Sequence, residues 1–179
     1  MIEKDGHYAV NMRTLAKKVG VTATSIYHYF ENKEELMLQL KLRAAEKLNS
    51  YIIPIENEPD PDTVLMKLGP GYIQFAQEHP RLYRFLFETS KGEIPFEEAD
   101  KPVLYHTYLV ARKANQIKAE RGDFSGKPEE GAMVGWMMLH GFCSLMLSGL
   151  LQAAEGLELE QLKEMFLNFF NQADGKGSS

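Results

Sequence analysis

The chain has 179 residues, of which 44% are hydrophobic and 25% charged, and its formal net charge is −5. These values are typical of a globular protein with a sizeable core, and the single cysteine excludes a disulfide framework and suits a reducing, cytoplasmic environment. No window approaches the roughly 20 apolar residues of a membrane span, because small and polar residues interrupt the longest apolar stretch, from Met133 to Leu151.

Residues 11–36, NMRTLAKKVGVTATSIYHYFENKEEL, have the pattern of two short helices joined by a tight turn. Asn11 can cap the first helix, Asn11 to Lys18, by accepting hydrogen bonds from the free N–H groups of its first turn. Gly20 ends this helix, since glycine adopts the left-handed conformation without steric cost. Apolar residues recur at steps of three and four and predict one buried face, made of Met12, Leu15, Ala16 and Val19.

The second helix, about Ala23 to Phe30, begins after Val21, which fills the turn, and Thr22, which caps it. Two helices joined by a short glycine-containing turn form the unit that places its second helix in the major groove of DNA. Hydroxyl and imidazole groups can donate to phosphates and base edges, and no carboxylate lies among them. The predicted DNA-binding residues are Asn11, Arg13, Thr22, Ala23, Thr24, Ser25, Tyr27, His28, Tyr29 and Lys33.

Basic charge gathers in the same part of the chain. Residues 11–33 hold four basic side chains and one acidic side chain. Residues 1–50 have a net charge of +2, whereas residues 51–179 have a net charge of −7. A basic head on an acidic body is the charge pattern of a nucleic-acid-binding module attached to a non-binding one.

The segment GVTATSIYHYFENKEEL resembles the end of the helix-turn-helix of the TetR family of transcriptional regulators. The positions that match are Gly20, Val21, Thr22, Tyr27, Tyr29, Phe30, Lys33 and Leu36, and the resemblance runs from about Gly6 to Leu40. It implies that Phe30 belongs to the core and that Tyr27 faces phosphate, while Tyr29 could do either. The chain departs from the family at its start, where only Met1 to Asp5 could belong to the family's first helix, so we expect that helix to be shortened.

The rest of the chain predicts helices separated by proline and glycine and no strand, so the fold class is all-α. The expected helices are Lys33 to Ser50, Pro61 to Glu78 with a kink at Gly69-Pro70-Gly71, Pro80 to Phe87, Pro102 to Arg121, Pro128 to Ala154, and Glu158 to Ala173. Pro54, Pro59 and Pro61 mark a loop, and so does the polar segment 89–99. We divide the chain into a DNA-binding head (1–45), a regulatory and dimerisation body (46–173) and a disordered tail (174–179).

Aromatic side chains of the body could line a pocket between helices, since ligand sites are mostly apolar with few polar groups. Trp136, His140 and Gly141 resemble the W…HG signature of one type of TetR C-terminal domain. Any of these side chains could instead belong to the ordinary core, and His140 could be a structural histidine. The predicted ligand-binding residues are Tyr72, Phe75, Phe85, Tyr105, Tyr108, Trp136 and His140.

The last two helices carry more apolar surface than one body can cover, which favours a two-fold interface of four helices. Small residues along the first of these helices would let the partners approach closely. The predicted interface residues are Met133, Met137, Ser144, Leu147, Leu151, Leu162, Phe166 and Phe169.

The sequence contains no nucleophile elbow, no phosphate-binding glycine run and no cysteine–histidine zinc spacing. We therefore expect no enzyme activity, no metal and no cofactor, and we expect Cys143 to be a small buried hydrophobe. The resemblance implies a homodimeric TetR-like repressor that a small apolar or amphipathic ligand releases from a palindromic operator. The alternative is a helical ligand-binding or enzymatic protein that has lost DNA binding, which the shortened first helix would explain.

Overall fold

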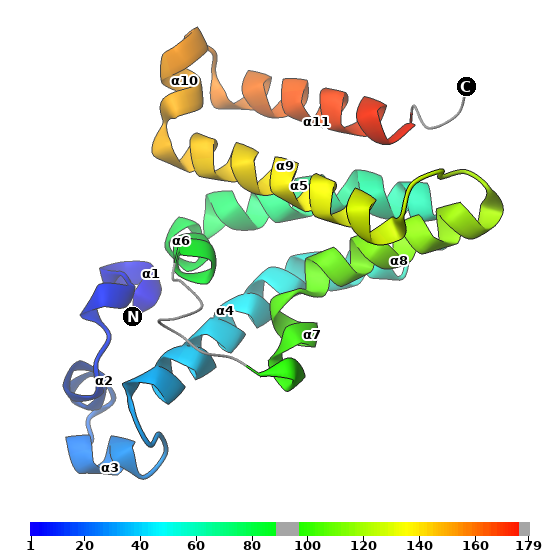
Figure 1. Ribbon diagram of the computed structural model, residues 1–179. Helices are drawn as coiled ribbons and strands as arrows, with labels where there is room; N and C mark the ends of the chain where they lie inside the picture. The colour runs from blue at the N-terminus through cyan, green and yellow to red at the C-terminus, as the bar shows by residue number, and fades with distance from the viewer. Residues whose placement is uncertain (89–96, 176–179) are drawn as a thin grey trace. The chain divides into compact units, whose positions relative to one another are not determined.

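The computed structural model describes residues 1–88 and 97–175, and within these ranges the chain forms α-helices and two short 3₁₀ helices but no strand (Figure 1). The predicted all-α class is confirmed. The helices are α1 (Ile2–Asp5), η1 (His7–Ala9), α2 (Met12–Val19), α3 (Ala23–Tyr27), α4 (Lys33–Glu56), α5 (Pro61–Glu78), α6 (Pro80–Glu88), η2 (Glu98–Asp100), α7 (Lys101–Leu104), α8 (His106–Arg121), α9 (Pro128–Ser148), α10 (Leu150–Glu155) and α11 (Leu159–Gly175).

These helices belong to two compact units. The head unit comprises Met1–Leu48 and Glu78–Leu104, and the body unit comprises Asn49–Gln77 and Tyr105–Ser179. The head predicted as residues 1–45 ends close to the first of these boundaries. The segment that contains α6, however, joins the head unit, whereas the sequence placed it in the body. Of the predicted tail, residues 176–179 lie outside the described residues, and α11 continues to Gly175.

The helices of the helix-turn-helix form where local hydrogen bonds and dihedral angles start and stop them. The Asn11 side chain accepts hydrogen bonds from the backbone N–H groups of Arg13 (3.1 Å) and Thr14 (3.0 Å). Gly20 ends α2 with a φ of 77°, in the left-handed region. Helix α3 stops at Tyr27 instead of the predicted Phe30, because the N–H groups of His28 and Tyr29 bond three residues back and tighten the chain into a turn.

Two prolines lie inside helices, and one of them, Pro54, was expected to end its helix. Helix α4 continues through Pro54 to Glu56, although the sequence predicted an end at Ser50. Pro54 lies in the last turn of α4, where the proline removes a single backbone N–H and little helix remains to be disrupted. Helix α5 likewise continues through Pro70 as one element.

Two helices that the sequence predicted as continuous are each divided. The helix expected from Pro102 to Arg121 is interrupted at Tyr105, whose φ of −110° and ψ of 19° are not helical. The helix expected from Pro128 to Ala154 is interrupted at Gly149, which has a φ of 75° and separates α9 from α10. The backbone of Gly149 thus makes a turn between the two helices. Of the predicted loop from residue 89 to 99, residues 89–96 lie outside the described residues.

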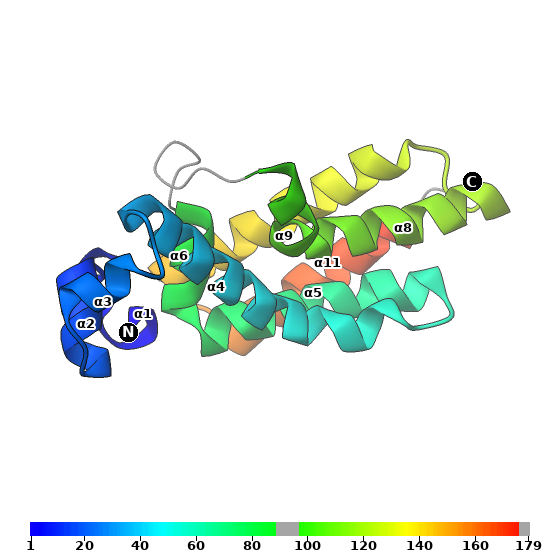
Figure 2. The same ribbon diagram turned by 90° about the horizontal axis from the view of Figure 1, so that it is seen from below.

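The body unit is built on helices α5, α8, α9 and α11, which Figures 1 and 2 show side by side. Gly69 and Gly71 of α5 permit close approach between these helices. A Cβ on Gly69 would lie 3.2 Å from Leu167 Cδ2, and a Cβ on Gly71 would lie 3.2 Å from the backbone oxygen of Tyr51. The glycines that we expected to kink α5 therefore let its neighbours pack against its backbone.

Among the described helices, α9 is long and apolar enough to cross a membrane by length and composition, contrary to our expectation from the sequence. A core helix of a protein outside membranes passes the same test. One side of α9 is buried within the body unit, at Leu139, Phe142, Cys143 and Met146, while the other side exposes Met133, Val134, Met137 and Leu145. Apolar residues thus occupy both the buried side and the exposed side of α9.

The two glycines of α5 provide a matched test of this packing. Alanine has a helix propensity about 1 kcal/mol better than glycine. At Gly71 the new methyl group would press on a backbone oxygen that cannot move, so we expect Gly71→Ala to lower the free energy of unfolding by about 1 kcal/mol. At Gly69 the neighbours are the ends of leucine side chains, so Gly69→Ala should be close to neutral. Urea denaturation of both variants checks this, and equal losses would contradict the role given to Tyr51.

Candidate nucleic-acid interface and effector cavity

The second helix of the helix-turn-helix is fixed from inside and capped at its start. Ile26 is buried, as is Ala16 on α2, and Phe30 is half-buried. Thr22 Oγ1 accepts a hydrogen bond from the backbone N–H of Ser25 at 3.2 Å, and the two hydroxyl groups lie 2.9 Å apart. The cap holds the start of α3 in one conformation while leaving the outer side of the helix free.

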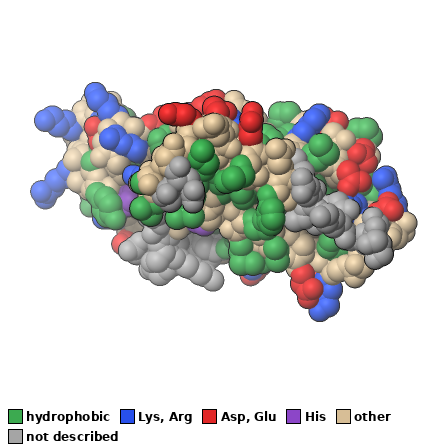
Figure 3. Space-filling model, turned by 90° about the horizontal axis from the view of Figure 1, so that it is seen from above, with side chains coloured by type: hydrophobic (Ala, Val, Ile, Leu, Met, Phe, Trp, Pro, Cys, Tyr) green, Lys and Arg blue, Asp and Glu red, His purple; other side chains and the backbone are tan. Residues whose placement is uncertain are grey.

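The predicted DNA-binding side chains lie on the surface of this unit. Ala23 and Ser25 are half-buried, and the exposed ones are Asn11, Arg13, Thr22, Thr24, Tyr27, His28, Tyr29 and Lys33. Tyr27 is 56% exposed and Tyr29 is 78% exposed. Such exposure of aromatic rings is expected where a surface binds another molecule. Lys and Arg side chains cluster at the left of Figure 3, over α1 to α3. The head therefore presents donors, rings and positive charge together.

Three apolar side chains near the same surface were misjudged or missed from the sequence. Val19 and Val21 are exposed, although we expected the first in the buried face of α2 and the second inside the turn. Tyr8 is exposed as well, and the sequence gave no signal for it. The short α2 buries Met12 and Ala16, and Val19 lies at its C-terminal end beyond that buried face.

The start of α4 adds a capped helix N-terminus to the head. Asn32 Oδ1 accepts a hydrogen bond from the backbone N–H of Glu35 at 2.8 Å, a cap that the sequence analysis overlooked. Lys33 is the first residue of α4 and its side chain is exposed. A helix N-terminus beside a lysine is a favourable place for a phosphate group.

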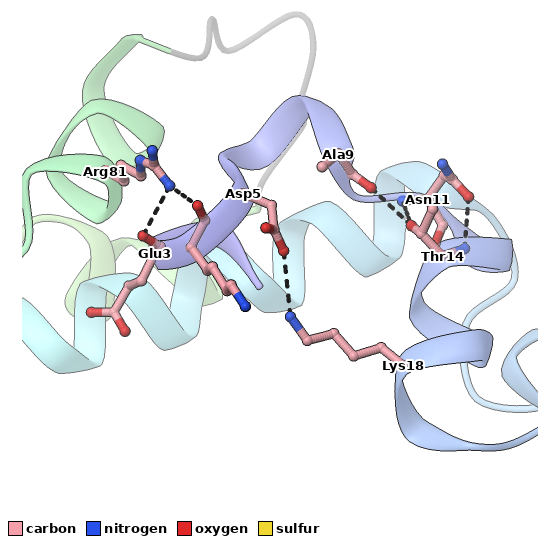
Figure 4. Close-up of polar contacts among 8 residues, drawn as sticks. Glu3, Asp5, Ala9, Asn11, Thr14, Lys18 and Arg81 are labelled. Atoms are coloured by element: carbon pink, nitrogen blue, oxygen red, sulfur yellow. Dashed lines mark hydrogen bonds and ion pairs between the residues drawn. The ribbon is translucent and has the colours of Figure 1, made fainter.

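The short first helix is held by polar contacts with α2 and α6 (Figure 4). Lys18 of α2 pairs with Asp5 at 3.4 Å. The Arg81 guanidinium donates to the backbone oxygens of Glu3 and Lys4, and His79 lies 2.5 Å from the Glu3 carboxylate. Because α1 has only four residues, the carbonyls that α6 satisfies are a large part of its backbone. These contacts join residues far apart in the sequence, so no local pattern predicted them.

The body unit contains a small cavity between α5, α8 and α9. Its volume is about 30 Å³, and it is lined by Leu65, Leu68, Thr107, Tyr108, Ala111, Asn115, Gly131, Ala132, Gly135, Trp136 and Leu139. Tyr108 and Trp136 were predicted as ligand-binding residues. Two further predicted residues surround Trp136: its Nε1 lies 3.4 Å from the Tyr72 hydroxyl, and the ring of Tyr105 meets it edge-on at 5.9 Å.

The other predicted ligand-binding residues do not line this cavity. Phe75 is fully buried and packs on Tyr51, with ring centroids 5.8 Å apart. Phe85 belongs to the head unit, where its ring lies 5.6 Å from that of His7. His140 lies 3.5 Å from Ser144, one turn along α9. The cavity instead uses Thr107 and Asn115, which sequence reasoning missed because polar residues inside a helix resemble surface positions.

An apolar groove lies on α9, α10 and α11 of the body unit. Its volume is about 440 Å³, and it is lined by Phe142, Leu145, Leu151, Leu162, Met165, Phe166 and Phe169. Figure 3 shows hydrophobic side chains gathered over these helices. Most predicted interface residues are exposed or half-buried here, but Leu162 is only 1% exposed. Most of its side chain therefore packs within its own chain, although Leu162 also lines the groove, and its assignment to the interface stays a prediction.

Cys143 is fully buried in α9, and burial raises the pKa of its thiol to about 12. The thiolate is the reactive form of cysteine, so this thiol is inert near neutral pH. Within residues 1–88 and 97–175, no cluster of His, Cys, Asp and Glu could hold a metal ion.

Comparison with known proteins identifies both ends of the chain. Residues 1–40 match the family described as "Bacterial regulatory proteins, tetR family", and residues 65–169 match "Tetracyclin repressor-like, C-terminal domain". The chain belongs to the TetR family. The resemblance inferred from the helix-turn-helix is thus confirmed.

Individual proteins are similar to this chain at low identity. The HTH-type transcriptional regulator YobS of Bacillus subtilis (strain 168) is 26% identical over 81 residues, which are 45% of this chain and 42% of YobS. The chain thus matches less than half of the length of this curated relative. A Rhodococcus sp. RHA1 protein of unknown function has 18% identity and a TM-score of 0.79, over 98% of this chain and 90% of that one. The regulator FadR from Bacillus subtilis, solved with stearoyl-CoA, has 15% identity and a TM-score of 0.64, over 99% and 94%.

The contact between α6 and α1 can be tested without DNA. Arg81→Ala leaves the last carbonyls of α1 without their donor, so the amides of Asp5 and Gly6 should exchange with solvent about fivefold to tenfold faster, corresponding to about 1 kcal/mol. Arg81→Lys offers a single ammonium group and should have an intermediate effect. Hydrogen exchange measured by NMR checks both variants. Unchanged exchange in Arg81→Ala would show that α1 does not depend on α6.

Proposed function

We propose that this chain is a dimeric repressor whose head binds a palindromic operator and whose body releases the operator when it binds a small effector. The observation that carries the proposal is the capped α3 with an outward row of donors and no carboxylate, from Thr22 to Tyr29. Phosphate oxygens and base edges both require donors, and a structural helix would not need to keep two tyrosines exposed.

The geometry favours a division of labour among these residues. Lys33 and Tyr27 suit contacts with phosphate, which position the protein irrespective of sequence. Thr24 and His28 suit contacts with base edges, where each lost contact is worth about 1–3 kcal/mol of discrimination. In a dimer the two α3 helices would read half-sites about one helical turn of DNA apart.

The proposed effector site is the body cavity around Trp136. TetR-family regulators typically bind small-molecule effectors and act as dimers, and this supports the same organisation here. Coupling between effector and operator would be about 1–3 kcal/mol and reciprocal, so operator DNA would weaken effector binding by the same factor. The alternative, a helical binding protein that has lost DNA binding, gives no reason for the exposed donors of α3.

Selection of binding sites from random double-stranded DNA, followed by a retardation assay, tests the proposal. We expect a palindromic consensus and a retarded complex that the same sequence with one half-site scrambled does not form. Absence of any selected sequence, with the protein folded and dimeric, would favour the alternative.

Lys33→Ala should weaken DNA binding about equally on operator and on random sequence. It removes one phosphate contact, so the slope of log affinity against log salt should fall by about one. Lys113→Ala, which removes an exposed lysine from the body unit, serves as the control and should leave the slope unchanged. Fluorescence anisotropy over a range of salt concentrations provides the measurement. Equal slopes for Lys33→Ala and the wild type would contradict the docking of α4 on phosphate.

Phe169→Glu should separate the dimer without unfolding the chain, because Phe169 is 65% exposed and borders the apolar groove. Burying an unpaired carboxylate in the interface costs several kcal/mol of association free energy, which is enough to favour the monomer. Sedimentation velocity at micromolar concentration should show a monomer with unchanged helicity, and operator affinity should fall with it. Asn168→Glu places the same charge on the adjacent exposed position of α11 and should leave the dimer intact.

A further inference from the structure

The wall of the cavity between α5, α8 and α9 includes a buried hydroxyl group, that of Thr107. Thr107 is only 8% exposed, and its Oγ1 has no hydrogen-bond partner in the described part of the chain. Leaving such a group buried and unpaired costs about 1–3 kcal/mol, so it requires an explanation. Asn115 lies on the same wall, 4% exposed, and its amide donates to the backbone oxygen of Pro128 at a long 3.4 Å. The Thr107 hydroxyl is therefore the polar group of this wall that is available to a molecule in the cavity, because the Asn115 amide already has a partner.

The rest of the lining is uncharged. None of the described residues that surround the cavity is Asp, Glu, Lys, Arg or His. Lys118, which is buried further along α8, is already paired with Asp62 at 2.5 Å. An ionised group would enter without a counter-charge, and burying an unpaired charge is far more costly than burying a neutral polar group. The cavity thus disfavours anions and cations.

The size of the cavity determines which side chains must move. A volume of about 30 Å³ holds little more than water, whereas a cavity that binds benzene has about 150 Å³. Leu65, Leu68 and Leu139 are buried, but Tyr108 and Trp136 are half-buried and can swing towards solvent. A larger molecule would therefore displace the Trp136 ring and stretch its 3.4 Å contact with Tyr72 on α5.

We propose that the effector is a small uncharged molecule with an apolar body and one hydroxyl group. Its apolar body would lie against Leu65, Leu68 and Leu139, and its hydroxyl would bond Thr107 Oγ1. This inference rests on the proposed function, because it assigns a chemical class to the effector of that regulator. Entry of the molecule is coupled to the Trp136–Tyr72 contact between α9 and α5.

The chain has one tryptophan, so tryptophan fluorescence reports directly on Trp136 and on this cavity. Three probes with the same ring and no absorbance at the excitation wavelength separate the chemistry: cyclohexanol, cyclohexane and cyclohexanecarboxylate. We expect cyclohexanol to change the emission saturably and to bind at least tenfold more tightly than the carboxylate. In Thr107→Val, which keeps the shape and removes the hydroxyl, the affinity for cyclohexanol should fall about tenfold and that for cyclohexane should not change.

Thr107→Val also provides a readout that needs no probe. Removing an unpaired buried hydroxyl should stabilise the free protein and raise its Tm by about 2–4 °C. Equal binding of the carboxylate, an unchanged cyclohexanol affinity in Thr107→Val, or no response to cyclohexanol would each overturn the inference.

The retardation assay, run on the same preparation, keeps the two proposals apart. DNA binding without the expected cyclohexanol response defeats only the effector class. The expected cyclohexanol response in a protein that selects no DNA defeats the regulator and leaves a site for neutral alcohols.

Discussion

The orientation of α3 on α2 depends on one backbone conformation, the left-handed Gly20. Its φ of 77° turns the chain so that the N–H of Val21 bonds back to Ala16 at 3.0 Å and α3 can begin at once. A residue with a Cβ would be strained there. The buried side of the head, the cap at Thr22 and the outward donors all follow from this turn, because α3 is too short to fix its own direction.

The body depends on a different constraint, which is how closely helices can approach α5. Gly69 and Gly71 remove two side chains from the middle of this helix, and the segments around Leu139, Leu167 and Tyr51 fill the space. The cavity beside Thr107 and Trp136, which α5 also lines, has a volume of only about 30 Å³. A small cavity in a tightly packed unit means that a ligand must move something to enter, which is what a regulatory site requires.

Helix α9 links the cavity to the apolar groove of the body unit. Trp136 and Leu139 line the cavity, whereas Phe142 and Leu145 line the groove about two turns further along. Phe142 stacks on Phe166 of α11 with ring centroids 4.3 Å apart, so the two helices share one apolar layer. A change in the position of Trp136 would therefore occur on the helix that also carries the proposed dimer surface.

The sequence by itself determined the elements whose causes lie within a few residues of each other. The cap at Asn11, the turn at Gly20, the start of α5 at Pro61 and the end of α8 at Gly122 all depend on local hydrogen bonds or on glycine and proline dihedral angles. The donors of α3 could likewise be predicted from the sequence, because their positions follow from where this short helix begins. The predicted boundaries were wrong at Pro54, which lies inside α4, and at Tyr105, which interrupts the helix expected from Pro102.

Only the tertiary structure decided which side chains meet. Arg81 reaches the carbonyls of α1 across 77 and 78 positions of sequence, and the cavity draws its wall from three helices. Leu162 and Phe169 belong to one apolar stripe of α11, yet one is buried and the other exposed. Periodicity shows that a helix has an apolar face, but the elements packed against that face determine how much of it is covered. For that reason the sequence could identify the DNA-binding head but could not find Thr107.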